Sequence, residues 1–321
     1  MSAPSTRFRH YQPGDAAALA EAWTLAAPRD AITPDRLRDL VLLDRNFAPE
    51  GLIVAEHDRR ITGAAYAVRR RVAETGDDLE PGRGWILFFF VVPAERGAGI
   101  GRTLLTRAMD WLRSSGASEV VFSAYTPNYV LPGLDEDRYP AASALLRSLG
   151  FTVLERPSAM GRSLRVYAMP DAERECADRL RAEGWYLGTL ADDDAVPLVA
   201  LARDEFNADW GRAIREGLVA GMSREHIIVA KNPGGEMIGW AMFGSYENVI
   251  DRFGPFGVLP SSRGTGLGRL LLHLTLERMA ACGAHSAWFL WADEGSVASA
   301  LYKKTGFEIT RTFSIMSAPL G

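Results

Sequence analysis

The 321-residue sequence has little cysteine, and its two cysteines lie far apart, at positions 176 and 282. That spacing fits neither a disulfide framework nor a cysteine-based metal site, and it is typical of proteins from a reducing cytoplasm. Long apolar runs are also missing: the longest, residues 85–92, is far shorter than the roughly 20 residues that cross a bilayer, and the N-terminus lacks the apolar core of a signal peptide. We therefore expect a cytoplasmic protein with no membrane partner and no metal.

An excess of positive charge is missing as well. The 36 Lys and Arg residues are outnumbered by 40 Asp and Glu, which leaves a net charge of −4 and no electrostatic reason to expect nucleic acid as a partner. With 47% hydrophobic and 24% charged residues, the composition is typical of a globular protein. The length predicts two domains, each with its own core.

The sequence contains the same unit twice. VVPAERGAGIGRTLL (91–105) and VLPSSRGTGLGRLLL (258–272) share one pattern of Val, Pro, Arg, Gly and Leu, and they lie 167 residues apart. Downstream, ASALLRSLGF (142–151) is repeated as ASALYKKTGF (298–307). We therefore expect an N-terminal domain over residues 1–169 and a C-terminal domain over 170–321. The first copy carries longer loops on both sides of its glycine segment.

Apolar periodicity predicts α/β structure in both copies. In the first copy we expect helices over 16–27, 34–43, 102–113 and 141–149, and strands over 52–56, 61–68, 85–92 and 119–124. In the second we expect helices over 195–203, 210–220, 269–281 and 297–304, strands over 227–230, 237–243, 253–258 and 286–291, and a connecting helix over 172–181. Asp15 and Thr33 are candidate N-caps of the first two helices.

Each glycine segment follows an apolar strand and leads into an amphipathic helix. Glycines expose backbone N–H groups, and a helix N-terminus attracts anions, so the segment predicts a diphosphate site with Arg96 and Arg102 as salt-bridging partners. A P-loop would need Lys where Arg follows the last glycine. A dinucleotide fingerprint would need GxGxxG and an acidic residue at Ser286, the counterpart of Glu119. A glycine-rich turn without a ligand is the remaining alternative.

The strand, the Val-x-Pro and the Arg-x-x-Gly-x-Gly at the start of a helix resemble the acetyl-CoA-binding motif of the GNAT acyltransferase superfamily. ALYKKTGF (300–307) is similar to the second signature of that family. The resemblance covers nearly the whole chain as two tandem copies. It implies an α/β fold of the α+β type, with two mixed sheets that are flanked by helices and splayed between their fourth and fifth strands. Acetyl-CoA is the implied co-substrate.

The resemblance also assigns residues to acetyl-CoA, position by position. In the first copy these are Val91, Val92, Arg96, Gly97, Ala98, Gly99, Ile100, Gly101 and Arg102. In the second copy they are Val258, Leu259, Arg263, Gly264, Thr265, Gly266, Leu267, Gly268 and Arg269. Tyr302 matches the tyrosine that protonates the departing CoA thiolate, whereas the first copy has Leu146 there. We therefore expect catalysis in the C-terminal domain and a catalytically degenerate N-terminal domain, unless Tyr125, Tyr129 or Tyr139 substitutes.

The sequence thus predicts an acetyl-CoA-dependent N-acetyltransferase that acts on a small-molecule amine by direct transfer in a ternary complex. A mycothiol-synthase-like acetyltransferase and a non-catalytic acyl-CoA sensor or interaction module are the alternatives, and the protein is expected to be a monomer or a homodimer. Candidate general bases in the second copy are Glu247, Asp251, Asp293 and Glu294. The first copy's insert, residues 124–140, is rich in Tyr and acidic residues, so it either lines a pocket for a cationic acceptor or forms an ordered loop.

Overall fold

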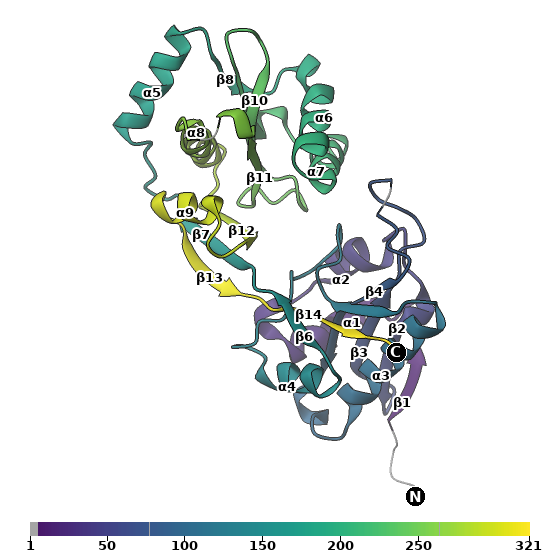
Figure 1. The fold of residues 1–321 in the computed structure, drawn as a ribbon. Coiled ribbons are helices and arrows are strands. Elements are labelled where there is room, and N and C mark those ends of the chain that lie inside the picture. The colour runs from purple at the N-terminus through teal and green to yellow at the C-terminus, as the bar shows by residue number, and fades with distance from the viewer. Residues whose placement is uncertain (1–5, 77, 263) are drawn as a thin grey trace, which may run out of the picture. The chain divides into compact units, whose positions relative to one another are not determined.

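The computed structural model describes residues 6–76, 78–262 and 264–321, and in it the chain divides into two units. Unit 1 contains the described residues up to Pro157 together with residues 313–321, and unit 2 contains residues 158–312. Each unit combines strands and helices, as expected, and Figure 1 shows the elements of both. The chain passes from one unit to the other twice, after Pro157 and again before Phe313.

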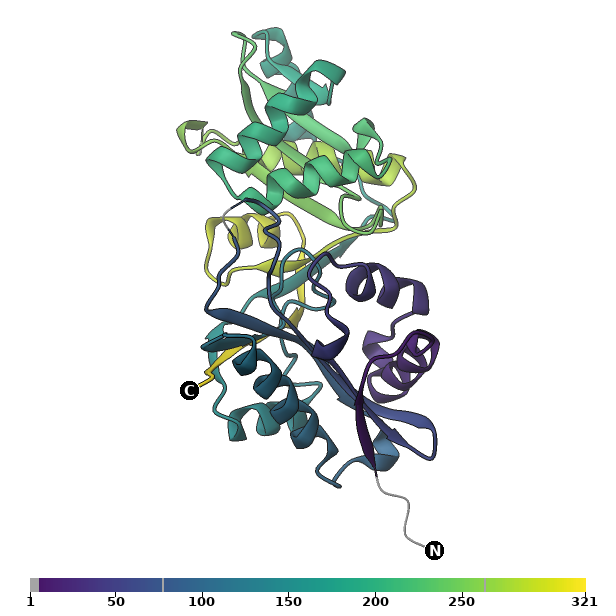
Figure 2. The same ribbon diagram turned by 90° about the vertical axis from the view of Figure 1, so that its right-hand side faces the viewer.

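Unit 1 is built on one seven-stranded sheet. Its strands, in spatial order, are β1 (Arg7–His10), β2 (Leu52–His57), β3 (Arg60–Val68), β4 (Arg83–Val91), β5 (Glu119–Phe122), β14 (Ile315–Pro319) and β6 (Thr152–Glu155). All neighbours are antiparallel except β4 and β5. Helix α1 (Ala16–Ala26) covers one face and α3 (Ile100–Ser114) the other, and Figure 2 shows them as the purple and blue helices on opposite sides of the sheet. The remaining helices are α2 (Pro34–Leu37), which continues into η2 (Arg38–Leu42), and α4 (Pro140–Ser148).

Side-chain alternation along the strands supplies both faces of this sheet. In β2, Leu52 and Val54 belong to the cluster beneath α1, whereas Ile53 and Ala55 belong to the cluster beneath α3. Because both faces are covered by helices, the central strands are apolar throughout. Burying each such side chain contributes about 1.5–3 kcal/mol, which fixes the register of the strands that carry the site.

Unit 2 has a sheet that is split in two. One part contains β11 (Phe253–Val258), β10 (Met237–Phe243), β9 (Ile227–Lys231) and β8 (Tyr186–Thr189), and the other contains β12 (Ser286–Ala292), β7 (Ser158–Ser163) and β13 (Glu308–Thr312). The helices are α5 (Asp171–Ala182), α6 (Ala195–Glu205), α7 (Ala208–Val219), α8 (Leu267–Ala281) and α9 (Val297–Lys304). Within the described residues, an isolated bridge between Arg252 and Trp288 is the ladder contact between the two parts. The predicted opening between the fourth and fifth strands is therefore present.

The two copies exchange their last strands. Strand β7 follows the last helix of the first copy, but it pairs with β12 and β13 of unit 2. Strand β14 ends the second copy, but it pairs with β5 and β6 of unit 1, where Figure 1 shows it in yellow among strands of earlier colour. The domain boundary predicted between residues 169 and 170 is thus not where the compact units divide, because each sheet is completed by a strand of the other copy.

The predicted helices and strands match the structure within a few residues, with two corrections. The helix expected over 34–43 changes its hydrogen bonding after Leu37 and ends at Leu42. Thr33 caps it as predicted, through a hydrogen bond from the amide of Arg36. Asp15 occupies the N-cap position of α1 as predicted, but its side chain accepts no capping hydrogen bond from that helix and pairs with Arg9 at 2.7 Å. Six short strands were not predicted, namely β1, β6, β7, β8, β13 and β14.

No helix among the described residues has the length and apolar character needed to cross a membrane. In the same residues, no group of three or more His, Cys, Asp or Glu side chains is arranged to hold a metal ion.

Candidate active site

A β-bulge in β4 opens the sheet of unit 1. Tyr66 of β3 pairs with Phe88 and the next residue, Ala67, pairs with Ile86, so Leu87 is an extra residue in β4. Bulges bend a strand and often lie beside active sites. Here β4 pairs with β5 only as far as Ile86 and Phe122, and beyond the bulge it diverges from β5. The edge of residues 87–91 that faces away from β3 therefore offers backbone N–H and C=O groups to a ligand.

The loop after β4 has the geometry of an anion site. Gly97 and Gly99 have φ angles of 85° and 79°, which residues with a side chain rarely adopt. Helix α3 begins directly afterwards, at Ile100. The first N–H groups of a helix have no acceptor within the helix, and the helix dipole adds positive charge at that end. The predicted diphosphate loop thus has the backbone that its chemistry requires.

A cavity of about 610 Å³ joins this loop to the opened edge of β4. Such a volume lies within the range of small-molecule sites. Of the predicted acetyl-CoA residues of the first copy, Val91, Arg96, Gly97, Gly99, Ile100, Gly101 and Arg102 line the cavity, and Val92 and Ala98 are not part of its lining. The insert of the first copy supplies a further wall, formed by residues 130–131, 133–135 and 138–140.

The cavity reaches both faces of the sheet. Phe89 and Val91 of β4 pack on the α3 side, where the glycine loop lies. Phe88 and Phe90 pack on the α1 side together with Trp23, whose ring lies 4.4 Å from that of Phe88 between centroids. Because all five residues line the same cavity, the gap between β4 and β5 connects the two faces. One ligand can therefore enter along the α3 side and meet a second ligand on the α1 side.

The two predicted phosphate partners have other contacts in this structure. The guanidinium of Arg96 donates to the carbonyls of Val91 and Ala26, at 3.0 and 2.8 Å. Arg102 donates to the hydroxyl of Ser148 at 2.8 Å. These acceptors are neutral. If either arginine side chain rotates to bind an anion, these contacts cost it hydrogen bonds to neutral groups and no ion pair.

Three of the acidic residues that the structure describes line the cavity: Glu95 precedes Arg96 in the glycine segment, and Asp30 and Asp135 come from other parts of the chain. Asp30, at the end of the 3₁₀ helix η1 (Pro28–Asp30), accepts a short hydrogen bond from the hydroxyl of Tyr139, and its backbone carbonyl accepts from the indole of Trp23 at 2.8 Å. Asp135 is buried and forms an ion pair with Arg138 at 3.2 Å. Asp30, Asp135, Arg138 and Tyr139 all line the cavity. Where these polar side chains line it, the cavity can therefore bind a polar or cationic group.

The three tyrosines considered as substitutes for the missing acid differ in position. Tyr139 lines the cavity. Tyr125 is fully buried and is not part of the lining; it accepts a hydrogen bond from Asn46 and donates to Asp44, and burial raises its pKa. Tyr129 is half-buried and is not part of the lining either. Leu146 is buried in the α3-side core.

The second copy repeats the loop. Gly264 and Gly266 have φ angles of 81° and 89°, and α8 begins at Leu267. Val258 is buried at the end of β11, and Leu259 packs against the core of the unit. Arg263 lies outside the described residues. The counterpart of Arg102 is Arg269, which forms an ion pair with the buried carboxylate of Glu173 at 2.7 Å, so this arginine is already neutralised.

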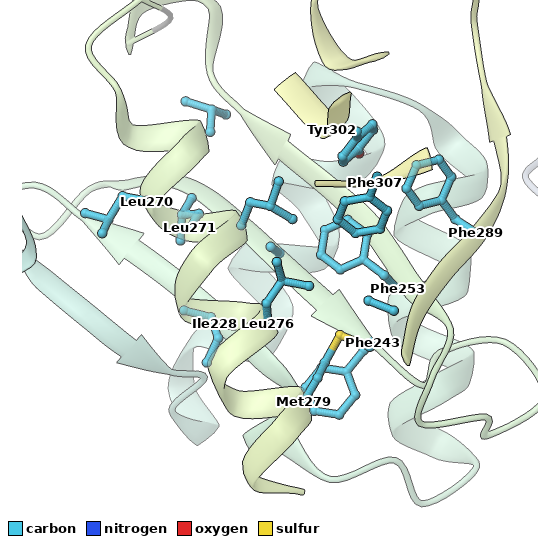
Figure 3. Packing of buried hydrophobic residues seen from close by; sticks show 14 of the residues in the cluster. Ile228, Phe243, Phe253, Leu270, Leu271, Leu276, Met279, Phe289, Tyr302 and Phe307 are labelled. Carbon is cyan, nitrogen blue, oxygen red and sulfur yellow. The ribbon is translucent and has the colours of Figure 1, made fainter. Parts of the chain in front are cut away.

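Aromatic rings from both parts of the sheet of unit 2 pack together. Tyr302 of α9 is 9% exposed, and its ring lies 4.5 Å from Phe289 of β12 and 5.5 Å from Phe307. Phe253 and Phe256 of β11 complete the cluster, and Figure 3 shows Tyr302, Phe307, Phe253 and Phe289 side by side. Burial raises the pKa of Tyr302, which favours its protonated form. The proposed proton donor is thus protonated but enclosed by rings.

The general-base candidates of the second copy are partly engaged. Asp251 accepts hydrogen bonds from the amide and hydroxyl of Ser286, Glu247 pairs with Arg252 at 3.3 Å, and Asp293 accepts from the indole of Trp291. A hollow of about 540 Å³ lies beside β10, and the charged residues among its described lining are Glu205 and Glu236.

Sequence reasoning missed Trp23 and Asp30. Both lie about 70 residues before the glycine loop, and the fold brings them to the cavity. Trp23 belongs to a predicted helix, whereas Asp30 belongs to a segment for which the sequence predicted no element. No local motif marks them, since a Trp on an amphipathic helix is usually a core residue.

Comparison with known proteins agrees with this geometry. Residues 17–130 match the model of the Acetyltransferase (GNAT) family, and residues 223–309 match that of the Acetyltransferase (GNAT) domain. The search of curated proteins found no match.

Three solved structures share the fold. The GCN5-related glucosamine N-acetyltransferase region of a fungal multi-domain GH3 β-N-acetylglucosaminidase matches with 18% identity and a TM-score of 0.78, over 99% of this chain but 38% of the fungal one. A GCN5-related N-acetyltransferase from Sphaerobacter thermophilus matches with 17% identity and a TM-score of 0.71, over 98% and 96% of the two chains. A tandem GNAT protein from the clavulanic acid biosynthesis pathway matches with 17% identity and a TM-score of 0.68, over 99% of both.

Two family models, one in each sequence copy, thus agree with the repeated strand, loop and helix and with a fold that tandem GNAT proteins share. The chain belongs to the GNAT acetyltransferase superfamily, as an acyltransferase with two GNAT domains in tandem.

Proposed function

We propose that the protein is an acetyl-CoA-dependent N-acetyltransferase, and that its acyl transfer takes place in the cavity of unit 1. The observation that carries this proposal is that one cavity connects an anion-binding loop, an open strand edge and a set of polar side chains. The acceptor is a small-molecule amine, because the cavity has the volume of a small-molecule site.

Acetyl-CoA fits the residues on the α3 side. The N–H groups at Gly97–Gly101 suit its diphosphate. The amides of the pantetheine arm can pair with the edge of β4 beyond the bulge, as a peptide pairs with an exposed strand edge. The thioester then lies near the gap between β4 and β5, where the α1 side of the cavity begins.

Transfer is direct, in a ternary complex. The amine nitrogen forms the new C–N bond at the thioester carbonyl, the C–S bond breaks, and of the two protons that the ammonium loses one ends on the CoA thiol and one in solvent. A covalent acyl-enzyme through cysteine is disfavoured because Cys176 lies on α5 and Cys282 just after α8, both in unit 2. Tyr139 is the tyrosine of the cavity wall and is our candidate for the proton donor to the thiolate.

In this proposal unit 2 is not the site of transfer, which revises the predicted division of labour. Its glycine loop has the same backbone, but Tyr302 is enclosed by the rings around it and Arg269 is paired with Glu173. These contacts favour the alternative of a non-catalytic module for this half. The role of Tyr302 as the acid stays a prediction from the sequence. A Tyr302→Phe variant is therefore measured together with the variants described next.

A matched pair of variants tests the proposal. Ala142 lines the cavity, and its repeat counterpart Ala298 is exposed at the start of α9. We expect Ala142→Trp to lower kcat/KM for CoA release by about a hundredfold or more, as the loss of a few kcal/mol of binding energy requires, and Ala298→Trp and Tyr302→Phe to leave it within about threefold. Loss of turnover in Ala298→Trp or Tyr302→Phe with normal turnover in Ala142→Trp would overturn the proposal.

Other properties stay predictions. The prediction of a cytoplasmic location rests on the cysteine content. The predicted monomeric or homodimeric state rests on the tandem repeat, and the predicted absence of a nucleic-acid partner rests on the net charge. A mycothiol-synthase-like acetyltransferase remains an alternative at the level of tandem architecture. Because one of the similar structures contains a glucosamine N-acetyltransferase region, that amino sugar is one acceptor to test.

A further inference from the structure

The α1 side of the cavity has a wall of mostly apolar character. Trp23, Phe88 and Phe90 present their rings there, and Val130 and Leu131 of the insert pack against the same cluster. The hydroxyl of Ser123, which also lines the cavity, is already used in a short hydrogen bond to the carbonyl of Leu131. The part of the wall that these apolar residues form therefore offers a ligand aromatic faces and aliphatic groups.

Asp30 supplies this wall with a carboxylate. Its contacts include a hydrogen bond from the Trp23 indole N–H to its backbone carbonyl and one from the Tyr139 hydroxyl to its side chain. The ring of Tyr139 packs against the α3-side core, whereas Asp30 follows α1 on the other side. The Tyr139–Asp30 hydrogen bond thus crosses from one face of the sheet to the other, next to the gap where two ligands would meet.

We infer that this wall binds a primary amine on an apolar, preferably aromatic, body, with Asp30 as the residue that holds its ammonium group. A carboxylate suits an ammonium, because a hydrogen bond between charged groups is stronger than one between neutral groups. The apolar body gains from burial against Trp23, Phe88 and Phe90. This inference names the acceptor class for the proposed function and rests on it.

The same wall disfavours an amino sugar. Each sugar hydroxyl that loses water without gaining a protein partner costs about 1–3 kcal/mol. A glucosamine molecule carries several hydroxyl groups, and the rings of the α1 side cannot hydrogen-bond to them. Comparing the binding of an apolar amine with that of glucosamine, which is of similar size, therefore shows whether the wall selects apolar amines or accepts any small amine.

The experiment compares 2-phenylethylamine and glucosamine with the full chain. Calorimetric titration of each amine into protein saturated with CoA measures binding without turnover, and CoA release from acetyl-CoA measures the reaction. We expect 2-phenylethylamine to bind at least about tenfold more tightly than glucosamine, a difference of about 1.4 kcal/mol. The KM values for the two amines should differ in the same direction.

Asp30→Asn isolates the carboxylate, since the asparagine carbonyl can still accept the Tyr139 hydroxyl. We expect it to weaken 2-phenylethylamine binding at least about tenfold, with KM for acetyl-CoA unchanged. The matched control is Asp35→Asn, at a side chain that is 79% exposed on α2, and it should change neither value.

Tighter binding of glucosamine, no binding of 2-phenylethylamine, or unchanged binding in Asp30→Asn would overturn the inference. A wild-type protein that binds the apolar amine but releases no CoA would support the inference and overturn the proposed function, so the two failures are distinguishable.

Discussion

The exchanged strands predict which pieces of the chain fold alone. A fragment of residues 158–312 contains all of the strands of unit 2, and its ends meet because Ser158 and Thr312 are partners in the β7–β13 ladder. Unit 1 can be made as residues 6–157 joined to 313–321, because the amide of Phe313 donates to the carbonyl of Pro157 at 2.9 Å. Fragments cut between 169 and 170, where the repeat alone places the boundary, lack one strand each.

The lost strands carry enough burial to decide the outcome. A fragment of residues 1–169 loses four fully or almost fully buried side chains of the C-terminal segment, Phe313, Ile315, Met316 and Leu320. At about 1.5–3 kcal/mol for each, the loss is about 6–12 kcal/mol, which is the size of the whole stability of a typical domain. The fragment 170–321 loses β7, the central strand of its three-stranded sheet, with the fully buried Met160. We therefore expect neither fragment of this pair to fold.

Circular dichroism with thermal and urea unfolding measures the outcome for all four fragments. The structure predicts cooperative transitions for residues 158–312 and for the joined unit 1, and none for 1–169 and 170–321 made separately. Mixing the last two should restore the fold, because together they contain every strand. Cooperative unfolding of both fragments cut at 169/170 would refute the exchanged topology.

Two further predictions concern buried ionisable groups. Burial tends to raise the pKa of Glu136, but hydrogen bonds from Ser143, Ser314 and Arg147 lower it to about 2. In urea titrations Glu136→Gln should therefore cost about 1–2 kcal/mol of unfolding free energy near neutral pH, after allowance for the partial exposure of the side chain, and progressively less as the pH falls from about 4.5 to 2. An equal cost at pH 3 and pH 7 would contradict this prediction. Burial lowers the pKa of His273 to about 4. Protonation of this histidine in the unfolded chain should therefore reduce the unfolding free energy by up to about 2–3 kcal/mol between pH 6.5 and 4. His273→Gln should remove this part of the pH dependence of stability, and an unchanged pH dependence would count against a neutral, buried histidine.

Much of the fold was predictable because its strong patterns are local. Helix α3 shows helical periodicity over its 15 residues, and the glycine loop with its helix N-terminus is encoded in one continuous segment. The repeat then predicted the same loop twice, and the positive φ angles of Gly97, Gly99, Gly264 and Gly266 confirm that both copies need glycine at those positions.

The exchange of strands was not predictable from the pattern. Strands β6, β7, β13 and β14 have four to six residues each, and β6 and β13 are largely exposed, so they lack the alternation that identifies a strand. Which sheet a short strand joins depends on tertiary packing. Met316 and Met160 are fully buried, but the sequence does not indicate in which core.

The glycine loop of the proposed site was predictable, whereas the cavity beside it and the residues proposed to bind the acceptor were not. The presence of Tyr302 and the absence of a tyrosine at Leu146 favoured the second copy, yet the rings of Phe253 and Phe289 that surround Tyr302 come from two strands distant in sequence. Asp30 reaches the cavity of unit 1 from the end of η1. Such neighbours are set by the fold, and they decide here which copy keeps an open cavity.

The most direct test of the account is a calorimetric titration of acetyl-CoA into the wild-type chain, Ala142→Trp and Ala298→Trp. Because Ala142 lines the cavity of unit 1 and Ala298 occupies the same repeat position in unit 2, the two tryptophans are matched. We expect Ala142→Trp to abolish the binding event that supports turnover, and Ala298→Trp to keep it with an unchanged Kd. Acyl transfer in unit 1 would be contradicted if binding and turnover persist in Ala142→Trp and disappear in Ala298→Trp.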